Sequence, residues 1–158
     1  MLRHLGLLSE HAAKKFGDNE ALIFEKQSFS FRKLHDLVEN FGAGLISLGV
    51  KEKDVVTLYA SNSWEWIVSY FAIARVGAVI NPVNTMLPSS EIIYVVNDCG
   101  AKTIICSEDK IQALEDIRMA KYDIKNKIEF GRNIPIRSLF IFFFAISFES
   151  LIQAVVNC

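Results

Sequence analysis

The side chains that most often perform catalysis are scattered along this sequence and do not form a group. The three histidines show neither metal-ligand spacing nor a nearby catalytic partner, so each is expected to be an ordinary surface or partly buried residue. Two pairs of adjacent acidic residues lie on one predicted amphipathic helix, where a solvated face explains them better than general acid–base chemistry. These residues are His4, His11 and His35, and the pairs Glu108-Asp109 and Glu115-Asp116.

Serine and cysteine, the usual nucleophiles, also lack a catalytic context. No GxSxG turn surrounds Ser61, Ser63 or Ser89, and their positions near predicted helix starts favour N-capping. The cysteines are odd in number and have no CxxC spacing, which argues against a disulfide framework and against a zinc site. Buried free thiols in a reducing compartment are expected instead, which predicts a cytoplasmic location. The cysteines are Cys99, Cys106 and Cys158.

The only closely spaced glycines are those of Gly42-Ala43-Gly44. A dinucleotide loop needs its glycines at a strand-to-helix turn, where backbone N–H groups can surround the phosphates. This pair lies inside a strongly predicted helix, and Ser47 stands where a third glycine would be needed. Close packing of helices therefore explains these glycines better than phosphate binding.

Four aromatic residues at helical spacing, Trp64, Trp66, Tyr70 and Phe71, have two interpretations. They could line a pocket for an acyl chain, but such a group more often belongs to the hydrophobic core. Taken by themselves, the residues of this chain identify no catalytic residue, no cofactor-binding residue and no metal ligand.

Composition narrows the class of protein. The 158 residues carry a formal net charge of −1 and are 51% hydrophobic, as in a globular domain. No basic stripe with interleaved aromatic residues is present, so nucleic acid is not an expected partner. The apolar run from Leu139 to Phe148 lies between Arg137 and Glu149, too short for a membrane-spanning helix of about 20 residues. Its phenylalanine and isoleucine content predicts a buried strand.

The N-terminal third is predicted to form two helices separated by a hairpin. Residues 7–16 fit an amphipathic helix, and residues 21–30 fit two short strands joined by a turn. The next helix has the clearest signals, because Ser30 can cap its start and Gly49 can end it. Leu8, Ala12 and Phe16 are expected to share one face of the first helix.

The following region alternates strands with helices. Residues 54–60 form a nearly continuous apolar run, as expected of a parallel strand buried on both faces. Asn62 is expected to cap the next helix, with Glu65 completing a variant of the capping box, and that helix is apolar almost all round. This order predicts an α/β fold in which helices flank a parallel sheet, with a small N-terminal β-hairpin. The remaining predicted strands are 78–82, 102–106 and 128–130, and the remaining predicted helices are 88–99 and 108–122. In the helix 88–99, the residues expected to face the core are Ile92, Val95, Val96 and Cys99.

An ordered series of these segments resembles the AMP-forming acyl-CoA synthetases, members of the adenylate-forming superfamily. The resemblance covers roughly residues 7–130 and rests on the order of the segments, since no single motif in it is catalytic. The matching segments are Ala21–Phe24, Phe29–Leu34, Val55–Tyr59, Asn62–Trp66, Ala72–Asn84 and Glu91–Lys102.

The resemblance implies a two-step reaction. Within the family, the sequence looks most like fatty-acyl-CoA or related carboxylate–CoA ligases. The carboxylate would attack the α-phosphate of ATP, and the CoA thiol would then displace AMP from the acyl-adenylate. ATP, Mg²⁺ and CoA are implied for the full-length family, but none is expected to bind this chain alone. The family's Ser/Thr/Gly-rich phosphate loop and its catalytic lysine do not occur in the sequence, so the chain is expected to be inactive by itself.

The resemblance also predicts the domain organisation. Residues 1–130 are expected to form an incomplete N-terminal subdomain of the synthetase fold, and residues 131–158 a divergent or truncated apolar tail. Ser147–Ala154 is similar to the short helix that precedes the family's phosphate loop. A truncated gene, a degraded paralogue and one half of a split enzyme with a complementing chain all fit this pattern. A non-catalytic interaction module, including one that contacts a membrane peripherally, is the alternative from another functional class.

Overall fold

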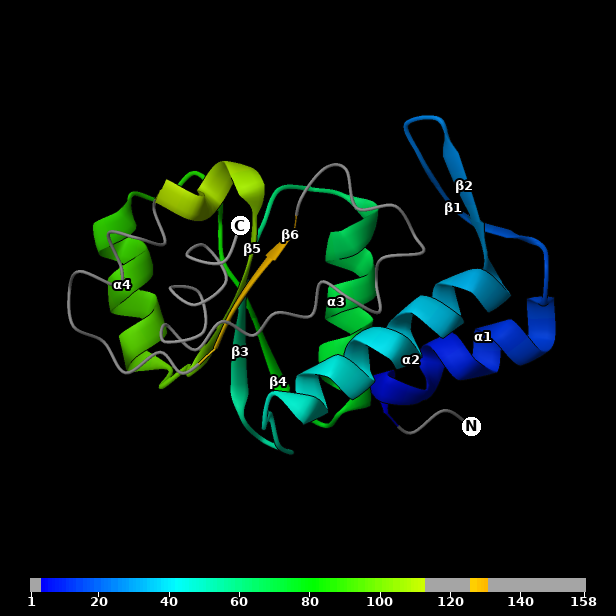
Figure 1. Ribbon diagram of the computed structural model, residues 1–158, viewed down its shortest axis with the longest axis horizontal. Coiled ribbons are helices and arrows are strands. Elements are labelled where there is room, and N and C mark those ends of the chain that lie inside the picture. Colours follow the sequence, from blue (N-terminus) through cyan, green and yellow to red (C-terminus); the bar gives the residue numbers. More distant parts are fainter. Residues whose placement is uncertain (1–3, 113–125, 131–158) are drawn as a thin grey trace, which may run out of the picture. The chain divides into compact units, whose positions relative to one another are not determined.

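The computed structural model describes residues 4–112 and 126–130 (Figure 1). The chain divides into two compact units that are interleaved in sequence. Unit 1 comprises Met1–Asp54 and Ser61–Asn81, and unit 2 comprises Val55–Ala60 and Pro82–Cys158. In the described residues, no helix is both long and apolar enough to cross a membrane.

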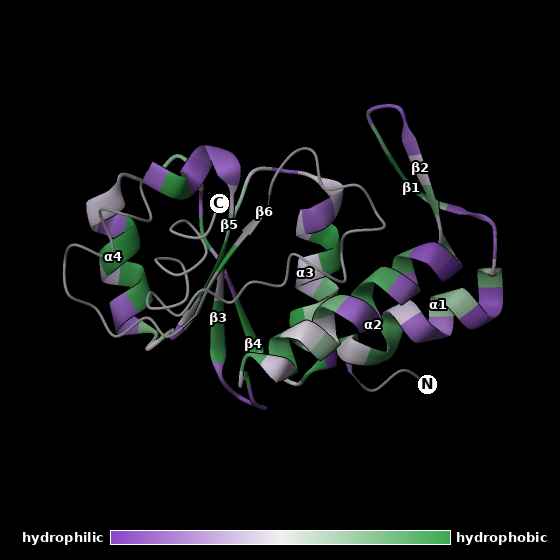
Figure 2. Cartoon of the chain, in the orientation of Figure 1, coloured by the Kyte–Doolittle hydropathy of each residue, from purple (hydrophilic) through white to green (hydrophobic). Residues whose placement is uncertain are grey.

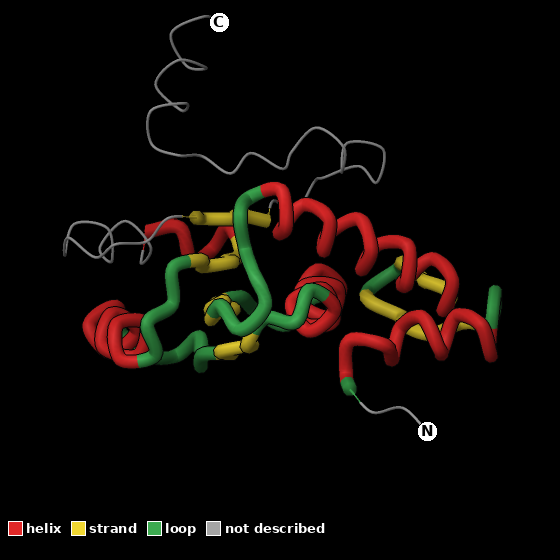
Figure 3. The backbone as a smooth tube through the Cα atoms, turned by 90° about the horizontal axis from the view of Figure 1, so that it is seen from below, coloured by secondary structure: helices red, strands yellow, loops and turns green. Residues whose placement is uncertain are grey.

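Unit 1 contains the two helices predicted for the N-terminal third, the hairpin between them and the next predicted helix. Helices α1 and α2 lie side by side, and α3 packs against α2 and the turn η1 (Figure 1, Figure 3). The hairpin closes through a two-residue turn in which Glu25 has a φ of 53°. The elements are η1 (Leu5–Leu7), α1 (Leu8–Phe16), β1 (Glu20–Phe24), β2 (Gln27–Ser30), α2 (Phe31–Ser47) and α3 (Trp64–Arg75).

Both predicted ends of α2 are confirmed. The Ser30 hydroxyl accepts a hydrogen bond from the Lys33 N–H at 3.2 Å. At the other end Gly49 has a φ of 83°, and its N–H donates to the Ile46 carbonyl at 2.9 Å. The Val50 N–H donates to the Leu45 carbonyl at 3.0 Å, which completes a Schellman motif. Between these caps α2 buries one apolar stripe, formed by Leu37, Val38, Phe41 and Leu45.

The predicted cap of α3 was wrong by one residue. The Ser63 hydroxyl, not Asn62, caps the helix by accepting the Trp66 N–H at 3.2 Å. With the cap at Ser63, Glu65 falls one position too early to close a capping box, although it remains in the positively polarised first turn. The all-round apolar character of α3 is confirmed, since none of its residues is exposed.

The apolar face of α1 is only partly buried. Leu8 is 38% exposed and Phe16 is 40% exposed, and Ala12 is half-buried. The buried residues of this segment are the small ones, Gly6 and then Ser9 and Ala13. A Cβ atom added to Gly6 would lie 2.5 Å from the Ala74 carbonyl oxygen, so the backbones of η1 and α3 approach very closely. Such an approach admits only small residues. The larger apolar side chains of α1 are partly exposed, and Phe16 packs on Phe31, with ring centres 4.9 Å apart.

Unit 2 is built on parallel strands. The strand order of the sheet is β4-β3-β5-β6, in which β5 pairs in parallel with β3 and β6, as in Val56 with Thr103 and Thr103 with Asn126. Four of the five residues of β3 are buried, as the apolar run predicts. The α/β fold with a parallel sheet is therefore confirmed. The elements of unit 2 are β3 (Val55–Tyr59), α4 (Ser89–Asp98), β5 (Thr103–Ser107), η2 (Glu108–Lys110) and β6 (Asn126–Phe130). Strand β4 (Val79–Pro82) belongs to unit 1 except for its last residue.

Helix α4 covers the core of unit 2. Its residues Ile92 and Val96 are buried as predicted, and Cys99 packs against the same cluster, but Val95 is only half-buried and Ile93 packs there as well. Ser89 does not cap the helix, because Pro88 occupies the N-cap position. The core cluster consists of Tyr59, Ile92, Val96, Ala101, Ile104 and Cys106.

Several predictions fall outside the described residues. The helix predicted for residues 108–122 starts as the turn η2, and its residues 113–122 are among those not described. The strand at 139–148, the helix at 147–154 and Cys158 also lie outside this range.

Candidate functional site

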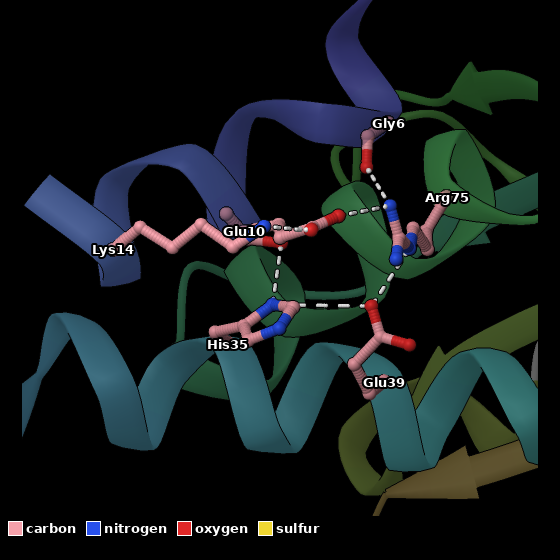
Figure 4. A network of polar contacts seen from close by, with 7 residues as sticks. Gly6, Glu10, Lys14, His35, Glu39 and Arg75 are labelled. Atoms are coloured by element: carbon pink, nitrogen blue, oxygen red, sulfur yellow. Dashed lines mark hydrogen bonds and ion pairs between the residues drawn. The ribbon is translucent and has the colours of Figure 1, made fainter.

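A polar network centred on Arg75 joins the three helices of unit 1 (Figure 4). From α3, the Arg75 Nη1 atom lies 3.0 Å from Glu10 Oε2 on α1 and donates to the Gly6 carbonyl at 3.5 Å. The Nε atom of the same guanidinium lies 2.7 Å from Glu39 Oε1 on α2. The arginine side chain is 26% exposed, so these contacts are only partly screened by water.

The network continues to both sides of the arginine. The Lys14 ammonium lies 2.5 Å from Glu10 Oε1, one helical turn away on α1. The hydrogen bond and charge of Lys14, followed by those of Arg75, hold the pKa of Glu10 below its ordinary value. On α2, His35 Nδ1 lies 3.2 Å from the Ser9 hydroxyl and 3.9 Å from Glu39 Oε1.

The combination of Ser9, His35 and Glu39 invites comparison with a hydrolytic triad. In a triad the serine contacts one imidazole nitrogen and the carboxylate orients the ring through the other. Here the hydroxyl and the carboxylate both approach Nδ1. The serine is also buried, at 8% exposure. The geometry therefore supports a structural role, in which polar contacts hold α1 against α2 and α3.

This grouping was not predicted from the sequence. The spacings Glu10 to Lys14 and His35 to Glu39 are signals for pairs on one helix turn, since side chains four residues apart face each other. Arg75, which joins the two pairs, follows Glu10 by 65 positions, and no local pattern connects them.

The carboxyl ends of the parallel strands in unit 2 are the second place to look, because ligands of open α/β sheets bind there. The Lys110 ammonium lies 5.8 Å from the centre of the Tyr59 ring and donates to the Thr85 carbonyl at 3.3 Å. It also lies 3.5 Å from Asp109 Oδ2, whose other oxygen accepts from the Ser107 hydroxyl. The charged groups of Lys110 and Asp109 at this edge thus already contact other residues of the protein. Tyr59 is almost fully buried.

The four predicted aromatic residues divide into two kinds. Trp64 is buried at the start of α3 and packs on Phe29, with ring centres 5.1 Å apart, so its assignment to the core is confirmed. Trp66 stacks on Tyr70 at 5.2 Å, and Phe71 meets Tyr70 edge-on at 5.8 Å. These three are half-buried.

The other residues considered from the sequence do not converge. His4 and His11 are exposed and lie apart from the contacts of His35. Cys99 is half-buried and Cys106 fully buried, and both are free of disulfides. Among the residues that the structure describes, no three His, Cys, Asp or Glu side chains are grouped so as to hold a metal ion. Residues 4–112 and 126–130 thus provide no grouped side-chain ligands for Mg²⁺.

Comparison with known proteins decides the family. A profile described as "AMP-binding enzyme" matches residues 9–133. The chain belongs to the AMP-binding enzyme family. The resemblance inferred from the ordered segments is thereby confirmed.

Two curated relatives of this AMP-binding family member are CoA ligases. A Mycobacterium tuberculosis protein, "3-[(3aS,4S,7aS)-7a-methyl-1,5-dioxo-octahydro-1H-inden-4-yl]propanoyl:CoA ligase", is 31% identical over 67% of this chain and 21% of its own length. The "Medium-chain acyl-CoA ligase ACSF2, mitochondrial" of Mus musculus is 31% identical over 72% of this chain and 19% of its own length. The chain thus spans about a fifth of the length of these relatives.

A solved structure supports the same assignment. The anthranilate CoA ligase AuaEII in complex with anthranoyl-AMP superimposes with a TM-score of 0.76 at 25% identity, over 80% of this chain and 25% of that chain.

Proposed function

We propose that this chain is part of an ATP-dependent carboxylate–CoA ligase that acts through an acyl-adenylate, with a fatty acid as the carboxylate. The observation that carries the proposal is the family match across residues 9–133, together with relatives named CoA ligases. A cytoplasmic location is part of the proposal, because the three cysteines of the sequence are odd in number and lack CxxC spacing.

The proposed chemistry proceeds in two displacements. A carboxylate oxygen attacks the α-phosphorus of ATP and releases pyrophosphate, and the CoA sulfur then attacks the acyl carbon and releases AMP. Mg²⁺ would neutralise charge on the phosphates. The described residues supply no phosphate-binding loop and no metal-ligand group. We therefore assign no chemical step to them and propose that they form a scaffold that does not catalyse the reaction alone.

ATP–pyrophosphate exchange tests the lack of activity. The purified 158-residue chain should show no exchange above background with a panel of medium-chain, long-chain and aromatic carboxylates. The full-length mouse relative, assayed in parallel, provides the positive control. Clear exchange by the isolated chain would refute the scaffold role.

A chimera tests the family function itself. Residues 9–133 of this chain would replace the matching segment of the mouse ligase, and exchange would be measured with the same carboxylates. A competent scaffold should retain measurable exchange. A chimera that folds, as judged by circular dichroism and a cooperative melt, yet shows no exchange with any carboxylate would contradict the proposal.

A further inference from the structure

The N-terminal segment, here defined as η1 and α1 (Leu5–Phe16), is attached to the rest of unit 1 with little deep apolar burial. None of the leucine and phenylalanine side chains of residues 5–16 is buried, and hydrophilic residues occupy much of α1 (Figure 2). An apolar contact is made at the end of α1, where the Phe16 ring packs on Phe31 of α2. The residues of the segment that are buried are small, namely Gly6, Ser9 and Ala13.

Helices α2 and α3, in contrast, each bury large apolar side chains and pack against each other. Their close contact continues at Gly42 of α2, whose added Cβ would already touch Val76 and the Ala72 carbonyl. Burial of this kind is the main source of stability in a folded domain. The side chains that are at most 2% exposed are Leu37, Val38 and Leu45 on α2, and Val68, Ala72 and Ile73 on α3.

The polar contacts of Arg75 supply much of what joins the N-terminal segment to this pair of helices (Figure 4). Two of them reach the segment, at 3.0 Å to Glu10 Oε2 and 3.5 Å to the Gly6 carbonyl. A third reaches α2, where Glu39 Oε1 is a buried atom 2.7 Å from Arg75 Nε. Together, the Arg75 guanidinium and these three partners are here called the Arg75 network.

Ion pairs of this kind respond to dissolved salt. The side chains of Arg75, Glu10 and Glu39 are 26%, 29% and 42% exposed, so ions in the solvent can approach them. Salt screens such pairs, whereas it does not weaken apolar packing between buried side chains. The attachment of the N-terminal segment should therefore depend on ionic strength more than the contact of α2 with α3 does.

We propose that the N-terminal segment opens as a separate unit, held on α2 and α3 by the Arg75 network and released when salt screens that network. Helices α2 and α3 stay packed during this opening. The fold of unit 1 thus contains a conformational switch that responds to ionic strength, and Arg75 is its positioning residue, because one guanidinium serves all three helices.

Hydrogen exchange followed by mass spectrometry tests the proposal on the whole 158-residue chain. Raising sodium chloride from about 0.1 M to about 1 M shortens the Debye length from about 10 Å to about 3 Å. The amides of residues 12–16 should then exchange at least about threefold faster, since partly buried pairs are screened less than exposed ones. The amides of residues 37–45 in α2 are the internal reference and should keep their exchange rate.

Two variants remove the Arg75 network from opposite sides. Arg75→Gln should accelerate exchange of residues 12–16 at low salt by at least about tenfold and should abolish the salt dependence, because hydrogen bonds to charged groups contribute on this scale. Glu10→Gln removes only the carboxylate of the segment and leaves the Arg75 pair with Glu39 in place. It should accelerate the same amides, and the double variant should exceed Arg75→Gln by little, since both changes break one contact.

Arg32→Gln is the matched control. Arg32 Nε lies 2.9 Å from Asp18 Oδ1 in unit 1, but these side chains are 60% and 80% exposed. Losing so exposed a pair should change exchange of residues 12–16 by less than about threefold. An effect as large as that of Arg75→Gln would overturn the proposal.

The wild-type salt titration and Glu10→Gln decide the matter even if Arg75→Gln fails to fold. Exchange of residues 12–16 that does not respond to salt would overturn the proposal. So would exchange of residues 37–45 that rises in step with that of residues 12–16, at high salt or in Glu10→Gln, because unit 1 would then open as a whole. Selective acceleration of residues 12–16 in both experiments supports a separately opening segment.

Discussion

The close approach of η1 to α3 predicts opposite effects for two glycine-to-alanine substitutions. A Cβ at Gly6 would lie 2.5 Å from the Ala74 carbonyl oxygen and 3.1 Å from both the Ala74 carbonyl carbon and the Arg75 Cα. All three neighbours are backbone atoms, so no side-chain rotation relieves the clash. The turn must retreat by up to about 0.9 Å to reach the 3.4 Å of ordinary contact, and the Gly6 carbonyl would move away from Arg75.

The net cost of Gly6→Ala follows from two terms. Overpacking a tight site costs about 1–3 kcal/mol. Restricting the unfolded chain by replacing glycine returns about 0.4–1 kcal/mol, because Gly6 does not have the positive φ that would make alanine strained. The free energy of unfolding should therefore fall by about 1–2 kcal/mol, which lowers the melting temperature by several degrees.

Gly42 is the matched control. A Cβ there would meet the Val76 Cγ1 atom at 3.4 Å and the Ala72 carbonyl oxygen at 3.9 Å, both ordinary contacts. Because Gly42 lies inside α2 and alanine is the better helix former by about 1 kcal/mol, Gly42→Ala should be neutral or stabilising. Urea unfolding followed by circular dichroism measures both variants. If Gly6→Ala proves as stable as Gly42→Ala, the close approach of the η1 and α3 backbones does not restrict Gly6 to glycine.

Two further predictions concern the caps and the polar network. Ser63→Ala should lower the free energy of unfolding by about 1 kcal/mol in urea titrations, whereas Asn62→Ala, one residue earlier, should change it by much less; equal losses would contradict the assigned cap. The folded-state pKa of Glu10 is depressed, so the stability it contributes is present above its unfolded pKa of about 4.5 and is lost as the pH falls through the lower folded value. Between pH 5 and pH 3, the melting temperature of Glu10→Gln should therefore fall less than that of the wild type. Glu25→Gln, on the exposed hairpin turn, is the control. Parallel pH profiles for the wild type and Glu10→Gln would contradict this role of Glu10.

Local signals predicted the elements well. The apolar run of β3, the Ser30 cap and the Gly49 terminator are each encoded within a few neighbouring residues, and the structure contains all three. The cap of α3 was misplaced because Asn62 and Ser63 are adjacent and both are good capping residues, so only the path of the chain selects between them.

Non-local features were not predictable in the same way. The pattern of α1 shows an apolar stripe but not which side of the helix meets its neighbours, and the residues that the structure buries are Gly6, Ser9 and Ala13. The contacts of Arg75 depend likewise on how α1, α2 and α3 pack, because the arginine and Glu10 are distant in sequence. The family could be inferred from the sequence, because the resemblance rests on the order of the strands and helices along the chain.

The interleaving of the two units matters while the chain is being synthesised. The sequence of unit 1 is complete once Asn81 has been added, yet it already carries β3 of unit 2. Val56 pairs with Thr103, so the parallel partner of β3 is translated 47 positions later. At typical ribosome speeds the delay is about 2–10 seconds, far longer than helix formation or collapse. Through that interval the nascent chain holds an apolar strand without its partner β5, and β3 is where binding by a ribosome-associated chaperone would most help this protein to fold.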